Sequence, residues 1–323
     1  MAQIVLGVAA SHSTLMNTHW DQVVHTDRAE RFRDALSAAH EAIVAAHPDI
    51  AVIVGSNHFR GFWLDLIPAF TLGVGEVNAS GEAGTPKGPQ LTDPVFAQSL
   101  AEYLVNAGTE VAISARLQID HGQSHAIQYL LAGLEIPVVP LVVNVFAAPL
   151  PVMSRCVELG ANIAAAITSM PDDRRVLVIA SGGLSHKLPW PSDWAHPGSD
   201  DEEFLVQAWL DGRGEWERFD TRRRQIITSA EPTIFPDFDQ AFLKRLDGGE
   251  LRHYQDVGTT ELEQQAGNGG QELRTWMTLA AAMGFAPGRT LAYEPMPEWL
   301  TGMGVAIFDP AEPASPAEPA SPA

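Results

Sequence analysis

Short runs of β-branched and other apolar residues alternate with amphipathic stretches over the first half of the chain. The apolar runs predict buried strands at Ile4–Ala9, Ile50–Gly55, Val138–Val145 and Val176–Ala180. Apolar residues at helical spacing predict helices at Ala29–His47, Pro94–Asn106, Ser124–Leu134 and Val152–Met170. Because strands that alternate with helices pair in parallel, this pattern predicts an α/β fold. We expect a largely parallel or mixed central sheet with helices on both faces.

The chain after Asp193 is more polar and contains more prolines between its periodic segments. Helices are expected at Glu202–Leu210, Gly214–Ser229, Phe238–Leu246 and Gly270–Met283, and two closing strands at Thr290–Tyr293 and Met303–Phe308. No linker rich in Gly, Ser or Pro interrupts residues 1–308, so we expect a single domain. Residues 309–323 repeat the motif AEPASP and are expected to form a mobile Pro/Ala-rich tail without chemistry.

Acidic side chains outnumber basic ones by 40 to 20, which gives a formal charge of −20 at pH 7. Nucleic-acid binding and docking on anionic membranes both need a basic surface, so we exclude both classes of partner. The first apolar run is too short to be a signal peptide or a membrane span. Cys156 is the single cysteine, which excludes an internal disulfide and favours a reducing, cytoplasmic setting.

Histidines follow several of the predicted strands, at the point where each strand ends. His12, His58 and His186 each come a few residues after a strand, and His121 precedes the helix expected from Ser124. The carboxyl ends of parallel strands share one edge of the sheet, which is where ligands bind, so these side chains should converge. The sequence therefore predicts a metal or catalytic site at this edge.

A carboxylate would complete a site for non-haem iron, which takes two imidazoles and one carboxylate on one face of the metal. Glu272 follows the breaker Gly267–Gly270 and opens an amphipathic helix. At that position the helix dipole favours the ionised form that a metal ligand requires. Asp120, Asp193 and Glu294 remain alternatives on sequence grounds.

Five sequence blocks, in a fixed order, carry a resemblance to a known family. They are Ser11-His12-Ser13, Asn57-His58-Phe59 with the following glycine-containing segments, Asp120-His121-Gly122, Ser181–His186, and Glu272 with Thr275-Trp276 and Pro297-Glu298-Trp299. Through these blocks the chain resembles the class III (LigB-type) extradiol catechol dioxygenases from about Ile4 to Gly304. It looks most like the branch that acts on 2,3-dihydroxyphenylpropionate.

The resemblance implies a role for each matching residue. His12, His58 and Glu272 correspond to the ligands of Fe(II), His186 to the active-site base and His121 to the acid. Residues 1–308 would then be a catalytic domain that cleaves a catechol ring beside its two hydroxyls with O₂, in the catabolism of aromatic compounds. The implied substrates are 2,3-dihydroxyphenylpropionate or 2,3-dihydroxycinnamate. Because family members form multimers, a homo-oligomer is also implied.

Some residues depart from the family pattern and leave the pocket for the ring substituent open. They are Asn57, His125, Lys187, Trp190 and the run Gly269–Gln271. Three alternatives therefore remain: the same reaction on another substituted catechol or a 2-aminophenol, a metal-dependent hydrolase that activates water on zinc, and a non-catalytic metal-binding relative.

A carboxylated catechol is an anion, and it would approach a protein of charge −20. A local cation must outweigh this field at the site. Arg60, Lys187 and Arg274 each lie within two residues of a predicted site residue, and we expect them to bind the carboxylate.

Overall fold

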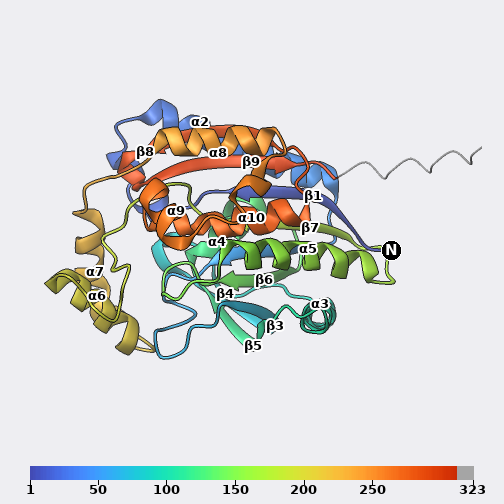
Figure 1. Ribbon diagram of the computed structural model, residues 1–323, viewed down its shortest axis with the longest axis horizontal. Coiled ribbons are helices and arrows are strands. Elements are labelled where there is room, and N and C mark those ends of the chain that lie inside the picture. The colour runs from blue at the N-terminus through green and yellow to red at the C-terminus, as the bar shows by residue number, and fades with distance from the viewer. Residues whose placement is uncertain (311–323) are drawn as a thin grey trace, which may run out of the picture.

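A computed structural model describes residues 1–310, which fold around one nine-stranded sheet (Figure 1). The strands are β1 (Gln3–Ala10), β2 (Ile50–Ser56), β3 (Phe70–Ser80), β4 (Lys87–Pro89), β5 (Ala112–Ile119), β6 (Val138–Val143), β7 (Arg175–Ser181), β8 (Arg289–Met296) and β9 (Thr301–Phe308). Their order in the sheet is β4-β3-β6-β2-β7-β1-β9-β8, and β5 pairs with β3.

The centre of the sheet is parallel, and the strand on each side of this centre runs antiparallel to it. Strands β6, β2, β7 and β1 run in parallel, so their carboxyl ends share one edge. On either side, β9 pairs antiparallel with β1, and β3 pairs antiparallel with β6. The α/β prediction with a mixed sheet is therefore confirmed.

Helices cover both faces of this sheet, as predicted. The helices are α1 (Thr14–Thr18), α2 (Thr26–Ala46), α3 (Pro94–Asn106), α4 (His121–Leu130), α5 (Met153–Ser169), α6 (Asp200–Asp211), α7 (Glu217–Thr228), α8 (Pro236–Asp247), α9 (Thr259–Ala266) and α10 (Leu273–Ala282). Alternate residues of β2 show the two faces: Val52 and Val54 pack with α3, α5 and α10, whereas Ala51 and Ile53 pack with α2 and α4. In Figure 1, α5 and α10 lie side by side across one face.

Helices α6 and α7 stand apart from the two layers. Figure 1 places them together at one end of the molecule. They pack through a small aromatic cluster in which Phe59 stacks on Trp209, with ring centroids 4.2 Å apart, beside Trp63 and Trp190. We call these two helices the cap, because α7 contributes side chains to the cavity beyond the carboxyl ends of the strands.

Three strands, β3, β4 and β5, were not among the predicted elements. Gly73 and Gly75 weaken the β signal of β3, yet the sheet needs Gly75: a Cβ there would come within 2.4 Å of the Ala115 carbonyl oxygen. Strand β5 exposes much of its length, so it lacks the apolar run that marks a buried strand. Short helices α1 and α9 were missed as well.

The remaining sequence predictions concern the ends of elements and the tail. Helix α4 begins at His121 rather than near Ser124, because the Asp120 side chain caps it by accepting from the Gly122 N–H at 2.9 Å. Strand β9 ends at Phe308, whereas the expected tail falls mainly on residues 311–323, outside the described residues. Within residues 1–310, the helices are too short or too polar to cross a bilayer.

Candidate active site

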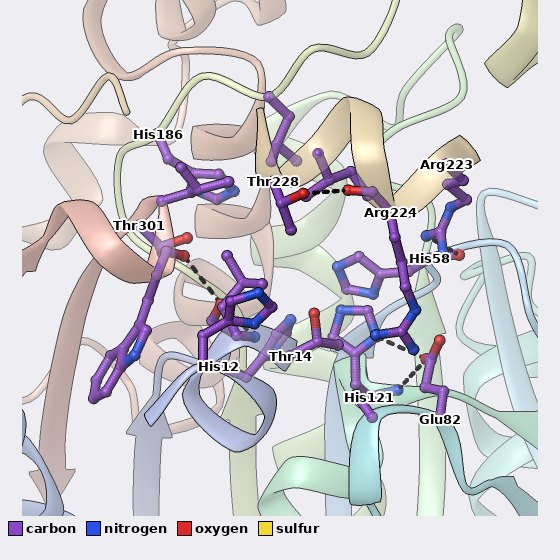
Figure 2. Close-up of a pocket in the computed structure, with 18 of the residues that line it drawn as sticks. His12, Thr14, His58, Glu82, His121, His186, Arg223, Arg224, Thr228 and Thr301 are labelled. Carbon is purple, nitrogen blue, oxygen red and sulfur yellow. Dashed lines mark hydrogen bonds and ion pairs between the residues drawn. The ribbon is translucent and has the colours of Figure 1, made fainter. Parts of the chain in front are cut away.

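The predicted histidines and Glu272 meet at the carboxyl edge of the parallel strands. His12 follows β1, His58 follows β2, and Glu272 immediately precedes α10. His121, at the start of α4, and His186, five residues after β7, complete the cluster. All five line one cavity, and Figure 2 shows the four histidines around it beneath α7.

The side chains of His12, His58 and Glu272 form a compact buried group. Glu272 Oε1 lies 3.2 Å from His12 Nε2 and 3.5 Å from His58 Nε2. The other nitrogen of each ring makes a hydrogen bond: His12 Nδ1 lies 2.9 Å from Ser181 Oγ, and His58 Nδ1 lies 3.3 Å from Asp120 Oδ1. This leaves both Nε2 atoms directed at one point, the arrangement that metal-ligating histidines adopt.

Two features show that this group fits a metal ion. His12 Nε2 is buried and makes no hydrogen bond within the described residues, although such an atom normally has a partner. Burial alone would raise the pKa of Glu272, but the adjacent His12 and His58 hold it well below its usual range. The carboxylate is therefore ionised, as a metal ligand must be.

The carboxylate of Glu272 is also fixed by two donors. It accepts hydrogen bonds from the Ser56 hydroxyl at 2.5 Å and from the Gly183 N–H at 2.6 Å. A Cβ on Gly183 would come within 2.9 Å of both Glu272 Oε2 and His186 Cε1. Only glycine therefore allows the backbone to approach both side chains at this point.

A proton competes with a metal at His58. Burial opposes the charged form, but the hydrogen bonds to Asp120 and Glu272 raise the pKa of His58 to about 9. Since an imidazole must be neutral to bind a metal, occupation of the site at neutral pH displaces this proton.

His121 offers a further nitrogen at the same place. Ligand nitrogens of His12, His58 and His121 lie within 4.8 Å of one another, so a three-histidine set is the geometric alternative to the set with Glu272. Glu82 Oε1 holds His121 Nδ1 at 2.7 Å. Burial and the neighbouring His58 lower the pKa of His121 to about 4 against the opposing effect of Glu82, so the resting imidazole is neutral.

His186 is oriented as a proton acceptor. Its Nδ1 lies 2.9 Å from the Leu184 carbonyl oxygen, which can only accept, so Nδ1 carries the proton and Nε2 is a free acceptor. Burial lowers the pKa of His186, which keeps it neutral. Asp239 fixes the preceding residue by accepting hydrogen bonds from the Ser185 N–H at 2.8 Å and its hydroxyl at 2.7 Å.

The three alternative carboxylates have other partners. Asp120 orients His58 and caps α4. Exposed Asp193 pairs with His196 at 2.9 Å, and Glu294 pairs with Arg31 at 2.6 Å. Neither Asp193 nor Glu294 lines the cavity.

Of the three cations expected to bind a substrate carboxylate, only Arg60 lines the cavity. It is buried and paired with Glu82 at 3.3 Å and Asp220 at 3.5 Å. Lys187 is exposed and does not line the cavity, whereas the neighbouring His186 is buried and does. Arg274 is two residues after Glu272 and points away, since residues at this spacing do not share a helix face. It donates to the Pro151 carbonyl oxygen at 2.7 Å and to Thr259 Oγ1 at 3.0 Å. The expectation for Lys187 and Arg274 is therefore wrong for this cavity.

Four charged residues of the cavity were missed from the sequence. Glu82 lies between β3 and β4, and Asp220, Arg223 and Arg224 are on α7. The run Arg222-Arg223-Arg224, in a chain with only 20 basic residues, was the one available signal. Burial and nearby Arg60 lower the pKa of Arg223 to about 9, so it remains a cation at neutral pH.

Together, the fold and the site define a metal-dependent enzyme in which His12, His58 and Glu272, the candidate ligand group, line one cavity. The sequence pattern of one protein family, described as the catalytic LigB subunit of aromatic ring-opening dioxygenase, matches residues 7–304. The chain belongs to this family. It is therefore an extradiol ring-cleaving dioxygenase, an oxidoreductase that acts on a catechol and O₂.

Individual relatives agree with this assignment. Proteins of Escherichia coli O139:H28 (strain E24377A / ETEC) and of Escherichia coli strain K12 are each 32% identical to this chain over 305 residues, covering 89% of it and 95% of the relative. Both are named 2,3-dihydroxyphenylpropionate/2,3-dihydroxicinnamic acid 1,2-dioxygenase. A crystal structure of an uncharacterised Escherichia coli K12 protein shares the fold, with a TM-score of 0.50 and 13% identity over 94% of this chain and 99% of that one.

Proposed function

We propose that the enzyme binds Fe(II) through His12, His58 and Glu272 and cleaves 2,3-dihydroxyphenylpropionate or 2,3-dihydroxycinnamate beside its hydroxyl groups. The observation that carries the ligand set is the position of Glu272 Oε1 against both Nε2 atoms, one of which has no hydrogen bond. Two imidazoles and one carboxylate are the ligand set that leaves a face of iron open for substrate and O₂. The names of the relatives that are 32% identical support the substrate.

Fe(II) in this group would hold the catechol and O₂ side by side and pass electron density from ring to oxygen. The protein supplies the proton transfers. His186 presents a neutral Nε2 to the cavity, and it accepts a proton from the catechol as the substrate binds. Such positioned acid–base groups contribute roughly 10²–10⁴-fold to rate.

Ring cleavage requires the O–O bond of O₂ to break. His121 is proposed as the acid that protonates the oxygen atom that leaves in this step. Because its pKa of about 4 leaves it neutral at rest, it must first receive a proton released by the substrate. Glu82, 2.7 Å from Nδ1, then stabilises the imidazolium and fixes which nitrogen faces the cavity. His121 and His186 thus start in the same protonation state and differ in their partners, a carboxylate for one and a carbonyl for the other.

A panel of catechols tests this proposal. The protein is loaded anaerobically with Fe(II), mixed with each catechol and O₂, and followed by O₂ uptake and by the yellow colour of a ring-opened product. We expect 2,3-dihydroxyphenylpropionate to give the highest kcat/KM. A higher value for another catechol or for a 2-aminophenol would reassign the substrate, and activity with zinc but without O₂ would favour the hydrolase.

The proposal includes a cytoplasmic homo-oligomer. Light scattering on the full chain measures the mass of the assembly, and a monomer at micromolar concentration would contradict that part.

A further inference from the structure

Three arginines are almost completely buried in the described part of the chain: Arg60, Arg223 and Arg274. Two of them have several partners. Arg60 contacts two carboxylates and the Phe59 carbonyl oxygen, and Arg274 donates to oxygens of Pro151, Thr259 and Gln271. The third is different.

Arg223 is 7% exposed and makes one long hydrogen bond, from a terminal nitrogen to the His58 carbonyl oxygen at 3.4 Å. Its Nε has no partner within residues 1–310, and no carboxylate among them lies within 4.0 Å of the guanidinium. A buried charge without a counter-charge is costly, so an arginine in this state is a site for an incoming anion.

The neighbouring carboxylates are already engaged. Glu82 pairs with Arg60 and with His121, and Asp220 pairs with Arg60 at 3.5 Å and with Arg224 at 2.9 Å. Arg60, Arg223 and Arg224 therefore share two carboxylates, Glu82 and Asp220, at this end of the cavity. A ligand with one negative charge would balance the group.

Arg223 also lies at a suitable distance from the ligand group. It lines the same cavity as His58, and Figure 2 shows it on α7 beside that histidine. It also donates to the main-chain oxygen of His58 at 3.4 Å, so it is close to a residue of the ligand group. One catechol with a short carboxylated side chain can therefore contact both the ligand group and Arg223.

We propose that Arg223 binds the side-chain carboxylate of the substrate and thereby sets the selectivity of this enzyme for anionic catechols. This inference rests on the proposed function. A guanidinium can donate two parallel hydrogen bonds to a carboxylate, and this pairing is strong where water is excluded. Arg60 has its charge neutralised by Glu82 and Asp220, and it serves to position them.

The test compares one charged substrate with its neutral counterpart, 2,3-dihydroxyphenylpropionate with 3-propylcatechol. Arg223→Met keeps the length of the side chain and removes the charge. We expect kcat/KM for the carboxylated catechol to fall about a hundredfold, mainly through KM, since a charged hydrogen-bonded pair is lost. Turnover of 3-propylcatechol should stay within about threefold, and Arg223→Lys should recover part of the loss.

Arg222→Met is the matched control, because Arg222 precedes Arg223 on α7 but is exposed and does not line the cavity. It should leave both substrates unchanged. An equal loss for both substrates in Arg223→Met would mean that Arg223 only supports α7, and the inference would be wrong.

The wild-type enzyme provides a measurement that does not depend on the folding of a variant. If it cleaves both compounds with similar kcat/KM, the inference fails while the proposed reaction stands. If it cleaves no catechol, the proposed function fails, and this inference fails with it.

Discussion

The two ends of the cavity are built in different ways. At the ligand end, His12, His58 and Glu272 come from the edge of the parallel strands and the start of α10, and donors behind them fix their orientation. At the cap end, Arg223 and Arg224 come from α7, which packs outside the sheet through a separate aromatic cluster.

From this difference we expect the ligand end to determine the reaction and the cap end to determine which catechol is preferred. The ligand end is fixed by the topology of the sheet, and its groups are matched in charge before a substrate arrives. At the cap end, Arg223 has no carboxylate within 4.0 Å among residues 1–310. We therefore expect changes at the ligand end to affect all catechols alike, and changes at the cap end to distinguish between them.

The largest effect should follow from Glu272→Ala, which removes the carboxylate that lies within 3.5 Å of both Nε2 atoms. Iron affinity should fall by more than about 10³-fold, because the proposed charged ligand is lost. Turnover of every catechol should disappear. Iron binding is measured anaerobically by calorimetry, with Glu294→Gln as the control carboxylate. Retained iron here, together with its loss in His121→Ala, would establish the three-histidine set.

A loss of turnover without loss of metal should follow from His186→Gln. The variant lacks the acceptor Nε2, so kcat should fall about 10²–10⁴-fold for charged and neutral catechols alike. Metal analysis should give the wild-type iron content, since His186 is not in the ligand group. The assignment would be contradicted if iron were lost in parallel with activity.

The proton on His58 predicts that iron affinity depends on pH. Between its ordinary pKa of 6.5 and its value of about 9 in the metal-free protein, each unit of pH should change the affinity by about tenfold, with tighter binding at higher pH. The metal-free protein should show the opposite trend, because a raised pKa stabilises the fold below pH 6.5 and this gain is lost as pH rises through about 9. Calorimetry in buffers of different ionisation enthalpy counts the released proton. Affinity that does not change with pH would show that His58 is already neutral.

A smaller effect is expected from Asp120→Asn, which weakens the support behind His58. Changes to groups that orient a metal ligand cost about 10–100-fold in metal affinity. The ratio of kcat/KM between the carboxylated and the neutral catechol should stay as in the wild type, because the cap end is untouched. A changed ratio would mean that the two ends are coupled.

The ligand end could be predicted from the sequence, and the cap end could not. His12, His58 and His186 follow strands of the parallel centre of one sheet, so topology alone brings them together. The positions of α6 and α7 depend on packing between aromatic residues far apart in the sequence, such as Phe59 and Trp209, which no local pattern reveals.

Neighbourhood in the sequence was a poor guide to the substrate-binding cations. Lys187 and Arg274 lie within two residues of site residues, but Lys187 is exposed and Arg274 is on another face of the helix. Arg223 is far from every predicted site residue in the sequence. Its proposed role depends on the absence, within residues 1–310, of a carboxylate beside it, and only a three-dimensional arrangement can show that.

The pairing of β1 with β9 has a consequence for the order in which the enzyme becomes active during synthesis. Ser11 Oγ contacts the Gly302 carbonyl oxygen across 291 positions of the chain, so the loop that carries His12 is anchored by one of the last elements to be made. Glu272 also emerges from the ribosome long after His12 and His58. A nascent chain that ends before Glu272 therefore lacks one member of the proposed ligand group, and a metal held by all three residues would bind only after this part of the chain has been made.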